Sequence, residues 1–257
     1  MPAKPIPEEQ TEKVKNLRGK MTAQQIADEV GVTIHQVHDV YRRHNMTTKQ
    51  NPTFELNMLQ KQLIYGGILG DGRLKRNGKY NYYYSECHAM QEKEYCEWKH
   101  RAFGNLTNGT NMYGKNLNNE YVDAIEFCTR TTPTLIEYAN LSKDEVIERI
   151  NEVGLIIFLL DDGWFNKSGK TGHFCVAGGV FSEEQLQKLC DKFNEYGFTT
   201  AHVVGRKSRD ISFLSSSNKY IYYLATKLVP ESTDIIQKKF KYMYETGQVA
   251  DFSKMYA

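Results

Sequence analysis

Two long apolar runs dominate the hydrophobic pattern of the chain, and both end in an aspartate followed by glycine. The first run covers residues 63–72 and the second covers residues 155–163. Each is long enough for a buried helix, and glycine is the usual residue for leaving a helix, because it enters the left-handed region at little cost. A carboxylate at the end of such a helix is costly to bury without a partner or a metal ion. We therefore expect Asp71 and Asp162 to belong to one shared site.

Glycines within the first run predict how the two helices meet. Gly66 and Gly70 lie four residues apart, and hence on one helical face. Glycine there costs about 1 kcal/mol of helix propensity, but it lets another backbone approach closely. We expect the two apolar helices to pack side by side and in parallel. That arrangement brings Asp71 and Asp162 to one end, where the helix dipoles favour a bound cation.

The segments after each apolar run alternate between hairpin and helix patterns, so that each half reads αββαββα. In the first half the pattern predicts a hairpin of 73–76 and 80–88 about Asn77-Gly78, a helix over 91–103 ended by Gly104, a hairpin of 110–113 and 121–129, and a short helix over 132–139. In the second half it predicts a helix from the capping box at Ser142 to Asp162, a hairpin of 164–167 and 171–177, a helix from Ser182 to Tyr196 ended by Gly197, strands 199–204 and 210–214, a helix over 218–228, and a closing segment 230–244. The fold class is therefore α+β, with two pseudo-symmetric halves.

A different pattern occupies residues 1–46 and predicts a small all-α helix-turn-helix domain. Thr22 and Thr33 are placed to cap two helices that Gly31 separates. The second helix would present outward-facing side chains to a DNA major groove and its phosphates: His35, Gln36, Asp39, Arg42 and Arg43. A helical hairpin used only for packing is the alternative. Polar residues 47–55 suit a linker, followed by a first half over 56–141 and a second over 142–257.

Composition narrows the class of protein further. The net charge of the 257 residues is only +2, so any basic surface must come from local clustering. Five scattered cysteines without a C-x-x-C pair fit a reduced, intracellular protein. The N-terminus lacks an apolar signal region, and no apolar segment approaches 18 residues. We expect a protein of the cytoplasm or another intracellular compartment of the host cell, neither secreted nor bound to a membrane.

The two motifs resemble those of the LAGLIDADG homing endonucleases. ILGDG at residues 68–72 is similar to the first motif of the intron-endonuclease-like subgroup, and FLLDDG at residues 158–163 is similar to the second. The resemblance covers about residues 56–245. It implies saddle-shaped antiparallel sheets along the major groove of double-stranded DNA, and a monomer that acts as a pseudo-dimer. It also implies a metal-dependent double-strand break at a long asymmetric target, with Mg²⁺ or Mn²⁺ as cofactor.

Carried over residue by residue, the resemblance assigns roles around the metal. Asp71 and Asp162 become the catalytic, metal-binding acids, while the backbones of Gly70 and Asp161 contribute carbonyl oxygens. A basic residue in each half assists, and the matching positions are Lys239 and Lys143. Solvated surface lysines are the alternative for both.

Basic and aromatic residues on the predicted strands would contact DNA, mostly at its phosphates. In the first half they are Arg73, Lys75, Arg76, Lys79, Tyr80, Tyr82 and Tyr84. In the second half they are Lys167, Lys170, Arg206, Lys207 and Arg209. We expect about half of them to touch DNA, since loop tips also carry ordinary solvated charges.

Two other functions remain open on the sequence. One is a catalytically inactive DNA-binding regulator, and the other is an RNA maturase that assists intron splicing. Because both motif acids are retained, the nuclease is favoured over the inactive regulator.

Overall fold

A computed structural model describes residues 5–18, 21, 23–44, 46, 52–78, 81–113, 124–168, 171–198, 202–204, 209–230 and 233–248. The chain divides into two compact units, Met1–Pro52 and Thr53–Ala257. Each unit has its own cluster of buried apolar side chains. None of the helices within those described ranges is long and apolar enough to cross a membrane.

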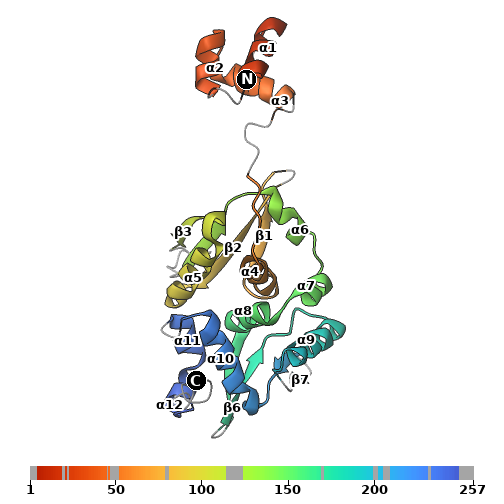
Figure 1. The fold of residues 1–257 in the computed structure, drawn as a ribbon, viewed down its shortest axis with the longest axis vertical. Coiled ribbons are helices and arrows are strands. Elements are labelled where there is room, and N and C mark those ends of the chain that lie inside the picture. Colours follow the sequence, from red (N-terminus) through yellow and green to blue (C-terminus); the bar gives the residue numbers. More distant parts are fainter. Residues whose placement is uncertain are drawn as a thin grey trace, which may run out of the picture. The chain divides into compact units, whose positions relative to one another are not determined.

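The amino-terminal unit contains three helices around a small apolar core (Figure 1). They are α1 Glu8–Leu17, α2 Ala23–Val30 and α3 Ile34–Arg43. Gly31 makes the turn between α2 and α3 with a φ of +74°, a value that glycine adopts at little cost. Thr33 and Gln36 then form a capping box that starts α3. The predicted helix, turn and helix are therefore present.

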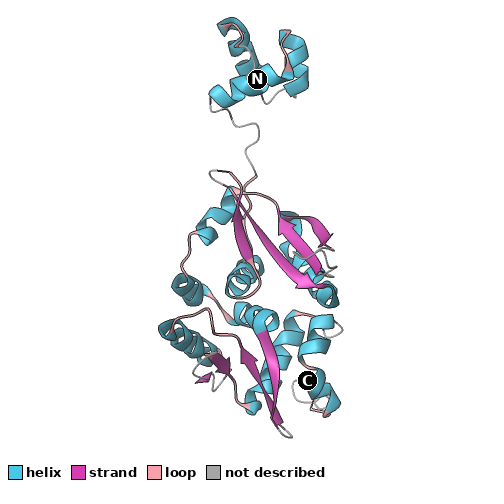
Figure 2. Ribbon diagram, turned by 180° about the vertical axis from the view of Figure 1, so that it is seen from behind, coloured by secondary structure: helices cyan, strands magenta, loops and turns pink. Residues whose placement is uncertain are grey.

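The second unit combines helices with two antiparallel sheets, and Figure 2 shows the strands in magenta with the helices packed beside them. The first half consists of α4 Met58–Leu69, β1 Arg73–Arg76, β2 Tyr82–Ala89, α5 Lys93–Phe103, β3 Thr107–Tyr113, β4 Ala124–Thr129 and α6 Ile136–Ala139. The second half consists of α7 Lys143–Arg149, α8 Glu152–Asp162, β5 Gly163–Ser168, β6 Thr171–Val176, α9 Glu183–Glu195, β7 His202–Val204, β8 Asp210–Ser212, α10 Asn218–Leu228, α11 Asp234–Lys239 and α12 Lys241–Glu245. Short 3₁₀ turns link several of these elements.

Both sheets have the same topology, which confirms the predicted α+β class and its internal repeat. The strand orders are β1-β2-β4-β3 and β5-β6-β8-β7. Each motif helix leads directly into the first strand of its own sheet, α4 into β1 and α8 into β5. The acids that end these helices therefore lie just before the first strand of each sheet.

Helices α4 and α8 pack side by side and in parallel (Figure 1). Their contacts advance together along both helices: Gln62 with Asn151, Gly66 with Gly154, and Gly70 with Asp161. A Cβ added to Gly66 would lie 2.5 Å from the carbonyl oxygen of Gly154. The parallel packing is confirmed, and so is the close backbone approach at Gly66, whereas Gly70 instead makes room for the side chain of Asp161.

The helix predicted from Ser142 to Asp162 is wrong as a single element. It is divided into α7 and α8, because Ile150 has an extended backbone with φ −69° and ψ 139°. The side chain of Asn151 then caps α8 by accepting a hydrogen bond of 2.9 Å from the backbone N–H of Val153. The break lets buried Ile150 pack into the core while α8 starts in a new direction.

The reason given for the glycines after the acids is also wrong. Neither Gly72 nor Gly163 is among the positive-φ glycines of the described residues, and Gly163 has a φ of −84°. Both positions are instead limited by space. A Cβ on Gly72 would overlap the Tyr84 hydroxyl group, and one on Gly163 would overlap the carbonyl oxygen of Leu159. Close packing, rather than left-handed backbone, requires glycine here.

The backbone contact at Gly66 generates a stability prediction. In an unhindered helix, Gly66→Ala would stabilise the protein by about 1 kcal/mol through helix propensity. Here the added methyl group must push α8 away, so we expect a net loss of about 1–3 kcal/mol in the free energy of unfolding. Urea unfolding followed by tryptophan fluorescence measures this loss in the second unit, because Trp98 and Trp164 both belong to it.

Met58→Ala is the matched control, since Met58 lies on the same helix and is 63% exposed. We expect it to change the free energy of unfolding by less than about 0.5 kcal/mol. A stabilised Gly66→Ala variant would show that the two helix backbones are not in contact.

Candidate active site

The two motif acids lie where the parallel helices α4 and α8 end. Asp71 follows Gly70, which caps α4, and its side chain is 38% exposed. Asp162 is the last residue of α8 and is half-buried. Burial raises the pKa of Asp162, and the negative charge of Asp71 raises it further, against the opposing charge of Lys239. The two carboxylates thus act on each other at the negative poles of two helices, a place that favours a cation.

Asp161 brings a third carboxylate to this point. Its side chain is fully buried, and Oδ1 accepts hydrogen bonds from Lys99 Nζ at 2.7 Å and from the Tyr95 hydroxyl at 2.9 Å. Oδ2 is buried without a hydrogen-bond partner among the described residues. Burial raises the pKa of Asp161 to about 6 in spite of Lys99. The sequence predicted a backbone role here, and the structure adds a carboxylate with one oxygen available to a ligand.

Lys99 connects Asp161 to a buried polar row on strand β2. The row consists of Tyr84, Glu86 and His88, alternate residues that face the core. Lys99 Nζ lies 2.6 Å from Glu86 Oε2, and the Tyr84 hydroxyl also donates to Glu86. Burial alone would raise the pKa of Glu86, but Lys99 and His88 lower it to about 2. Burial would lower the pKa of Lys99, but Asp161 and Glu86 raise it. Lys99 therefore joins the first half to the end of α8.

The imidazole of His88 is only 4% exposed and lies among carboxylates. Its Nε2 is 3.0 Å from Glu86 Oε2, and its Nδ1 is 3.6 Å from Glu92 Oε2 and 3.7 Å from Asp71 Oδ2. Burial would lower the pKa of His88, but hydrogen bonds to Glu86 and Glu92 raise it to about 9. One potential ligand atom from each of Asp71, His88 and Asp161 lies within 4.8 Å of the other two. This donor set fits a divalent cation.

Glu86, His88 and Lys99 were not predicted as site residues. Alternation along β2 puts Glu86 and His88 on the face of Tyr84, but the sequence does not show that this face is the buried one. Nothing in the sequence around Lys99 distinguishes it from a solvated lysine on a charged helix.

The two predicted assisting lysines have different surroundings. Lys239, on α11, donates from Nζ to the carbonyl oxygen of Asp161 at 3.3 Å and also to that of Gly163. Burial lowers its pKa, and Glu92 is the largest opposing influence. Lys143 instead donates to the carbonyl oxygen of Val180 at 2.7 Å. Among the described contacts of the first half, Lys99 brings an ammonium to Asp161, the residue before the second motif acid.

The outer face of the first sheet follows from the β1–β2 register. Arg73 pairs with Ser85 and Lys75 with Tyr83, so these four side chains share the face opposite the core. Lys75 lies 3.2 Å from Glu126 and its ammonium is 5.9 Å from the centre of the Tyr83 ring. Arg73, Lys75 and Tyr83 therefore lie together on the outer face of the first sheet.

The prediction that Tyr84 contacts DNA is wrong. Tyr84 is 0% exposed, because alternation turns it toward the core when Tyr83 faces outward. Tyr82 shares the face of Tyr84 and is half-buried, and its backbone pairs with Thr132. Arg76 is exposed at the strand end, where its Nε donates to the carbonyl oxygen of Gly78 at 3.0 Å.

In the second sheet, the outer face carries a tryptophan next to the acids. Phe165 pairs with Phe174 on the core side, so Trp164 faces outward, directly after Gly163, and is 39% exposed. Lys167 shares the side of Phe165 and lies over the Tyr242 ring, although it is itself exposed. Arg209 is half-buried with a φ of 50°. The remaining predicted contacts lie outside the described residues: Lys79, Tyr80, Lys170, Arg206 and Lys207.

Helix α3 of the amino-terminal unit exposes His35 and Arg42, while Gln36 is half-buried in the capping box. The expectation that Asp39 faces outward is wrong, because its side chain is only 10% exposed. It pairs with Arg42 and, at 2.7 Å, with Arg43. Both arginines keep exposed side chains, so Asp39 orients them along the helix surface.

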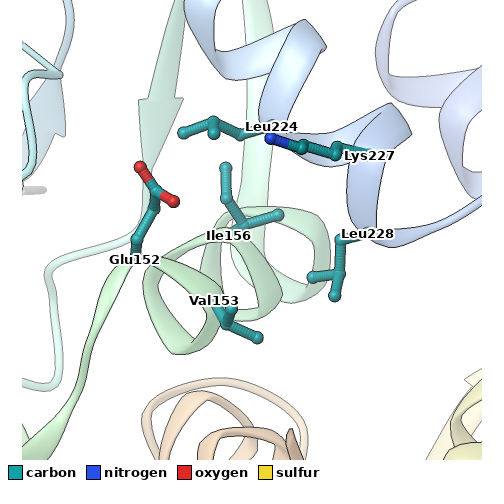
Figure 3. A pocket seen from close by; sticks show the side chains of 6 residues that line it. All are labelled: Glu152, Val153, Ile156, Leu224, Lys227 and Leu228. Atoms are coloured by element: carbon teal, nitrogen blue, oxygen red, sulfur yellow. The ribbon is translucent and has the colours of Figure 1, made fainter.

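A cavity of about 120 Å³ lies apart from the acids (Figure 3). It is lined by residues of α8 and α10: Glu152, Val153, Ile156, Leu224, Lys227 and Leu228. Glu152, Val153 and Ile156 lie in the first turns of α8, whereas Asp161 and Asp162 are its last residues. The cavity is therefore no part of the acid site.

Comparisons with known proteins agree with this architecture. The model of the LAGLIDADG DNA endonuclease family matches residues 61–218. No curated protein matches the chain. The solved homing endonuclease I-WcaI bound to its DNA recognition sequence superimposes with a TM-score of 0.60 at 17% identity, covering 78% of this chain and 92% of that chain.

Two further solved structures match with lower TM-scores. The LAGLIDADG meganuclease I-AabMI bound to uncleaved DNA gives 0.48 at 12% identity, over 77% of this chain and 92% of that chain. The N-terminal LAGLIDADG domain of DUF199/WhiA gives 0.36 at 12% identity, over 68% and 87%. The family model spans more than half of the sequence, and the chain belongs to the LAGLIDADG DNA endonuclease family.

Proposed function

We propose that the protein is a site-specific endonuclease that hydrolyses both strands of double-stranded DNA in a metal-dependent reaction. The observation that carries this proposal is the placement of Asp71 and Asp162 at the same end of the parallel helices α4 and α8, each just before the first strand of a sheet. The fold shared with I-WcaI, a protein solved on its DNA recognition sequence, supports a similar placement of DNA along the sheets. One chain supplies both halves, so we propose a monomer acting as a pseudo-dimer.

Asp71 and Asp162 would hold the divalent cation, Mg²⁺ or Mn²⁺, and the buried, unpartnered Oδ2 of Asp161 fits the same role. When bound, the ion supplies charge stabilisation at the phosphate and activation of a water molecule. Lys239 fixes the turn out of α8 through two carbonyl oxygens, and its ammonium adds positive potential beside the acids. Arg73 and Lys75 would contact the DNA from the outer face of the first sheet.

The target would be long and asymmetric, because the two halves present different chemistry at equivalent places. Two residues after the motif acid, the first half carries Arg73 and the second half carries Trp164. The amino-terminal unit would lengthen the target by placing α3 in an adjacent major groove, with His35 and Arg42 toward the DNA. Tethering then raises the affinity of the whole chain.

The roles of the acids generate the first functional prediction. Selection of cleaved sites from a random DNA library in magnesium identifies the target. On that target, Asp71→Asn and Asp162→Asn should each lower the cleavage rate by about 10²-fold or more, since several kcal/mol of charge stabilisation is lost. Binding of the DNA in the absence of metal should remain.

Asp191→Asn, on the exposed side of α9, is the matched control and should cleave like the wild type. Full plasmid linearisation by both active-site variants would contradict the assignment. Binding without cleavage by the wild type would favour the inactive regulator, whereas splicing assistance that survives loss of both acids would favour the maturase.

Trp164 permits a direct test of where DNA lies. The chain has two tryptophans, and the other one, Trp98, stacks on Tyr95 with ring centroids 5.9 Å apart. In a Trp98→Phe variant, we expect target DNA to quench Trp164 fluorescence. A Trp164→Phe variant, which retains Trp98, should show little change. Trp164→Ala should weaken DNA binding by on the order of 1 kcal/mol, because base–aromatic contacts carry energies of this size.

Unchanged Trp164 fluorescence at saturating DNA would place the DNA on another surface. This conclusion requires that Trp98→Phe binds the target DNA with wild-type affinity, and the same titration measures that affinity.

The amino-terminal unit generates a footprinting prediction. Deleting residues 1–46 should shorten the protected DNA and weaken binding, and Arg42→Ala in the full chain should reduce the salt dependence of binding by about one phosphate contact. Lys13→Ala is the control, since Lys13 lies on α1 and pairs with Glu9. An unchanged footprint and affinity after the deletion would leave the unit without a DNA-binding role.

A further inference from the structure

The buried row on β2 is not required by the fold, because the second half builds the same strand without it. Leu74 pairs with Tyr84 in the first sheet, and Phe165 pairs with Phe174 in the second. Both Leu74 and Phe165 stand three residues after their motif acid. Tyr84 is therefore equivalent to Phe174. Two residues later Glu86 corresponds to Val176, and four residues later His88 corresponds to Gly178. Val176 is fully buried, so an apolar residue suffices at the place of Glu86, and the carboxylate in the first half has another purpose. Gly178 lies beyond the end of β6, so His88 has no equivalent on that strand.

The orientation of His88 indicates that purpose. Glu86 is held in place by Lys99 and by Tyr84, and its Oε2 lies 3.0 Å from His88 Nε2. An imidazole whose one nitrogen donates to a fixed carboxylate presents its other nitrogen as a ligand, which is the usual arrangement around protein-bound metals. Here the other nitrogen, Nδ1, lies between two carboxylates, 3.6 Å from Glu92 Oε2 and 3.7 Å from Asp71 Oδ2.

Asp161 completes the set. Its Oδ1 is occupied by Lys99 and Tyr95, whereas Oδ2 is buried and has no partner in the part of the chain that the structure describes. Gly70 makes room for this side chain, because a Cβ there would lie 2.7 Å from the Cβ of Asp161. Ligands of one ion stand up to about 4.4 Å apart when each bond is about 2.0–2.2 Å. The 4.8 Å limit on the separations of the Asp71, His88 and Asp161 ligand atoms is close to that span.

We propose that Asp71, Asp161 and His88 form a mixed oxygen and nitrogen site for a divalent transition-metal ion, with His88 binding through Nδ1 and Glu86 orienting its ring. The site deepens the proposed nuclease function and rests on it, since Asp71 belongs to both. An imidazole ligand favours ions such as Mn²⁺, Co²⁺ or Zn²⁺ over Mg²⁺, which prefers oxygen alone. The ion takes the place of a proton on Nδ1. One ion would then be held by ligands from both halves, two from the first and one from the second.

Mn²⁺ alone, added to the full chain without DNA, tests the proposal. Pulsed electron paramagnetic resonance detects nitrogen bonded to Mn²⁺ as a ¹⁴N modulation. We expect this modulation in the wild type and its loss in His88→Gln, with Mn²⁺ affinity weakened roughly 10-fold or more. Glu86→Gln should weaken binding by about 10–100-fold, the usual effect of losing a partner that orients a histidine ligand.

His100→Gln is the matched control. His100 lies on α5 in the same half, and its Nε2 is also buried without a partner among the described residues, but it does not belong to the ligand set. It should retain both the modulation and the affinity. Thermal unfolding of each variant checks that it is folded. If His88→Gln does not fold, the wild-type spectrum still overturns the proposal when it lacks ¹⁴N modulation, and Glu86→Gln and His100→Gln then test the assignment to His88.

Three results would overturn the proposal: no Mn²⁺ bound at millimolar concentration, Mn²⁺ bound without ¹⁴N modulation, or an unchanged signal in folded His88→Gln. The second result would mean that His88 only bridges Glu86 and Glu92. Cleavage in magnesium that depends on Asp71 and Asp162 would leave the nuclease function intact in each case. If His88 binds the ion but the protein cuts no DNA, the metal site stands and the nuclease function fails.

Discussion

The contact between the backbones of α4 and α8 is the constraint from which the rest of the second unit follows. Gly66 meets the carbonyl oxygen of Gly154 closely, and the contacts of Gln62 with Asn151 and of Gly70 with Asp161 on either side fix the parallel direction and the offset. Residues 154–160 of α8 are all buried, so the pair forms the centre of the core and cannot slide without exposing apolar surface. Parallel packing also places two negative helix poles and the motif acids together, an arrangement that repels itself unless cations are present.

Each half contributes a lysine that compensates this repulsion in a different way. Lys239 binds the carbonyl oxygens of Asp161 and Gly163, and Lys99 binds the carboxylates of Asp161 and Glu86. A fully buried ammonium between two buried carboxylates is seldom the most stable filling for a core, and apolar residues of the same size often do as well or better. The second half, with Val176 at the place equivalent to Glu86, shows that this fold accepts the apolar solution. The charges near Asp71 are therefore better explained by the site than by stability.

Periodicity and glycine spacing were enough to predict the repeat, most elements and the parallel helix pair, because these depend on local sequence. The face of β2 was not predictable in the same way. Residues 82–84 are three tyrosines in a row, so alternation has no polar residue to mark the outer face, and only pairing with β1 shows that Tyr83 is outward and Tyr84 inward. The break at Ile150 was missed because apolar residues continue through it at helical spacing, at positions 146, 147, 150 and 153.

The site was predictable only where it coincides with the motifs. Asp71, Asp162 and Lys239 belong to segments that resemble a known family, whereas Lys99 reaches the acids from a helix 62 residues before Asp161. Its role depends on how α5 packs against the end of α8, which is tertiary information. A charged residue on a charged helix predicts solvent exposure, and here that expectation fails because two buried carboxylates compensate the ammonium.

The distribution of positive charge bears on how the two units would share DNA binding. On the outer face of the first sheet, Lys75 is partly neutralised by Glu126, and the exposed residue nearest Asp162 on the second sheet is the uncharged Trp164. Such faces favour reading of base edges and shape over attraction to phosphates. Non-specific affinity comes mainly from cations that displace counterions. If the amino-terminal unit binds DNA as we propose, Arg42 and Arg43 supply part of that attraction, and the sheets are left to discriminate among sequences.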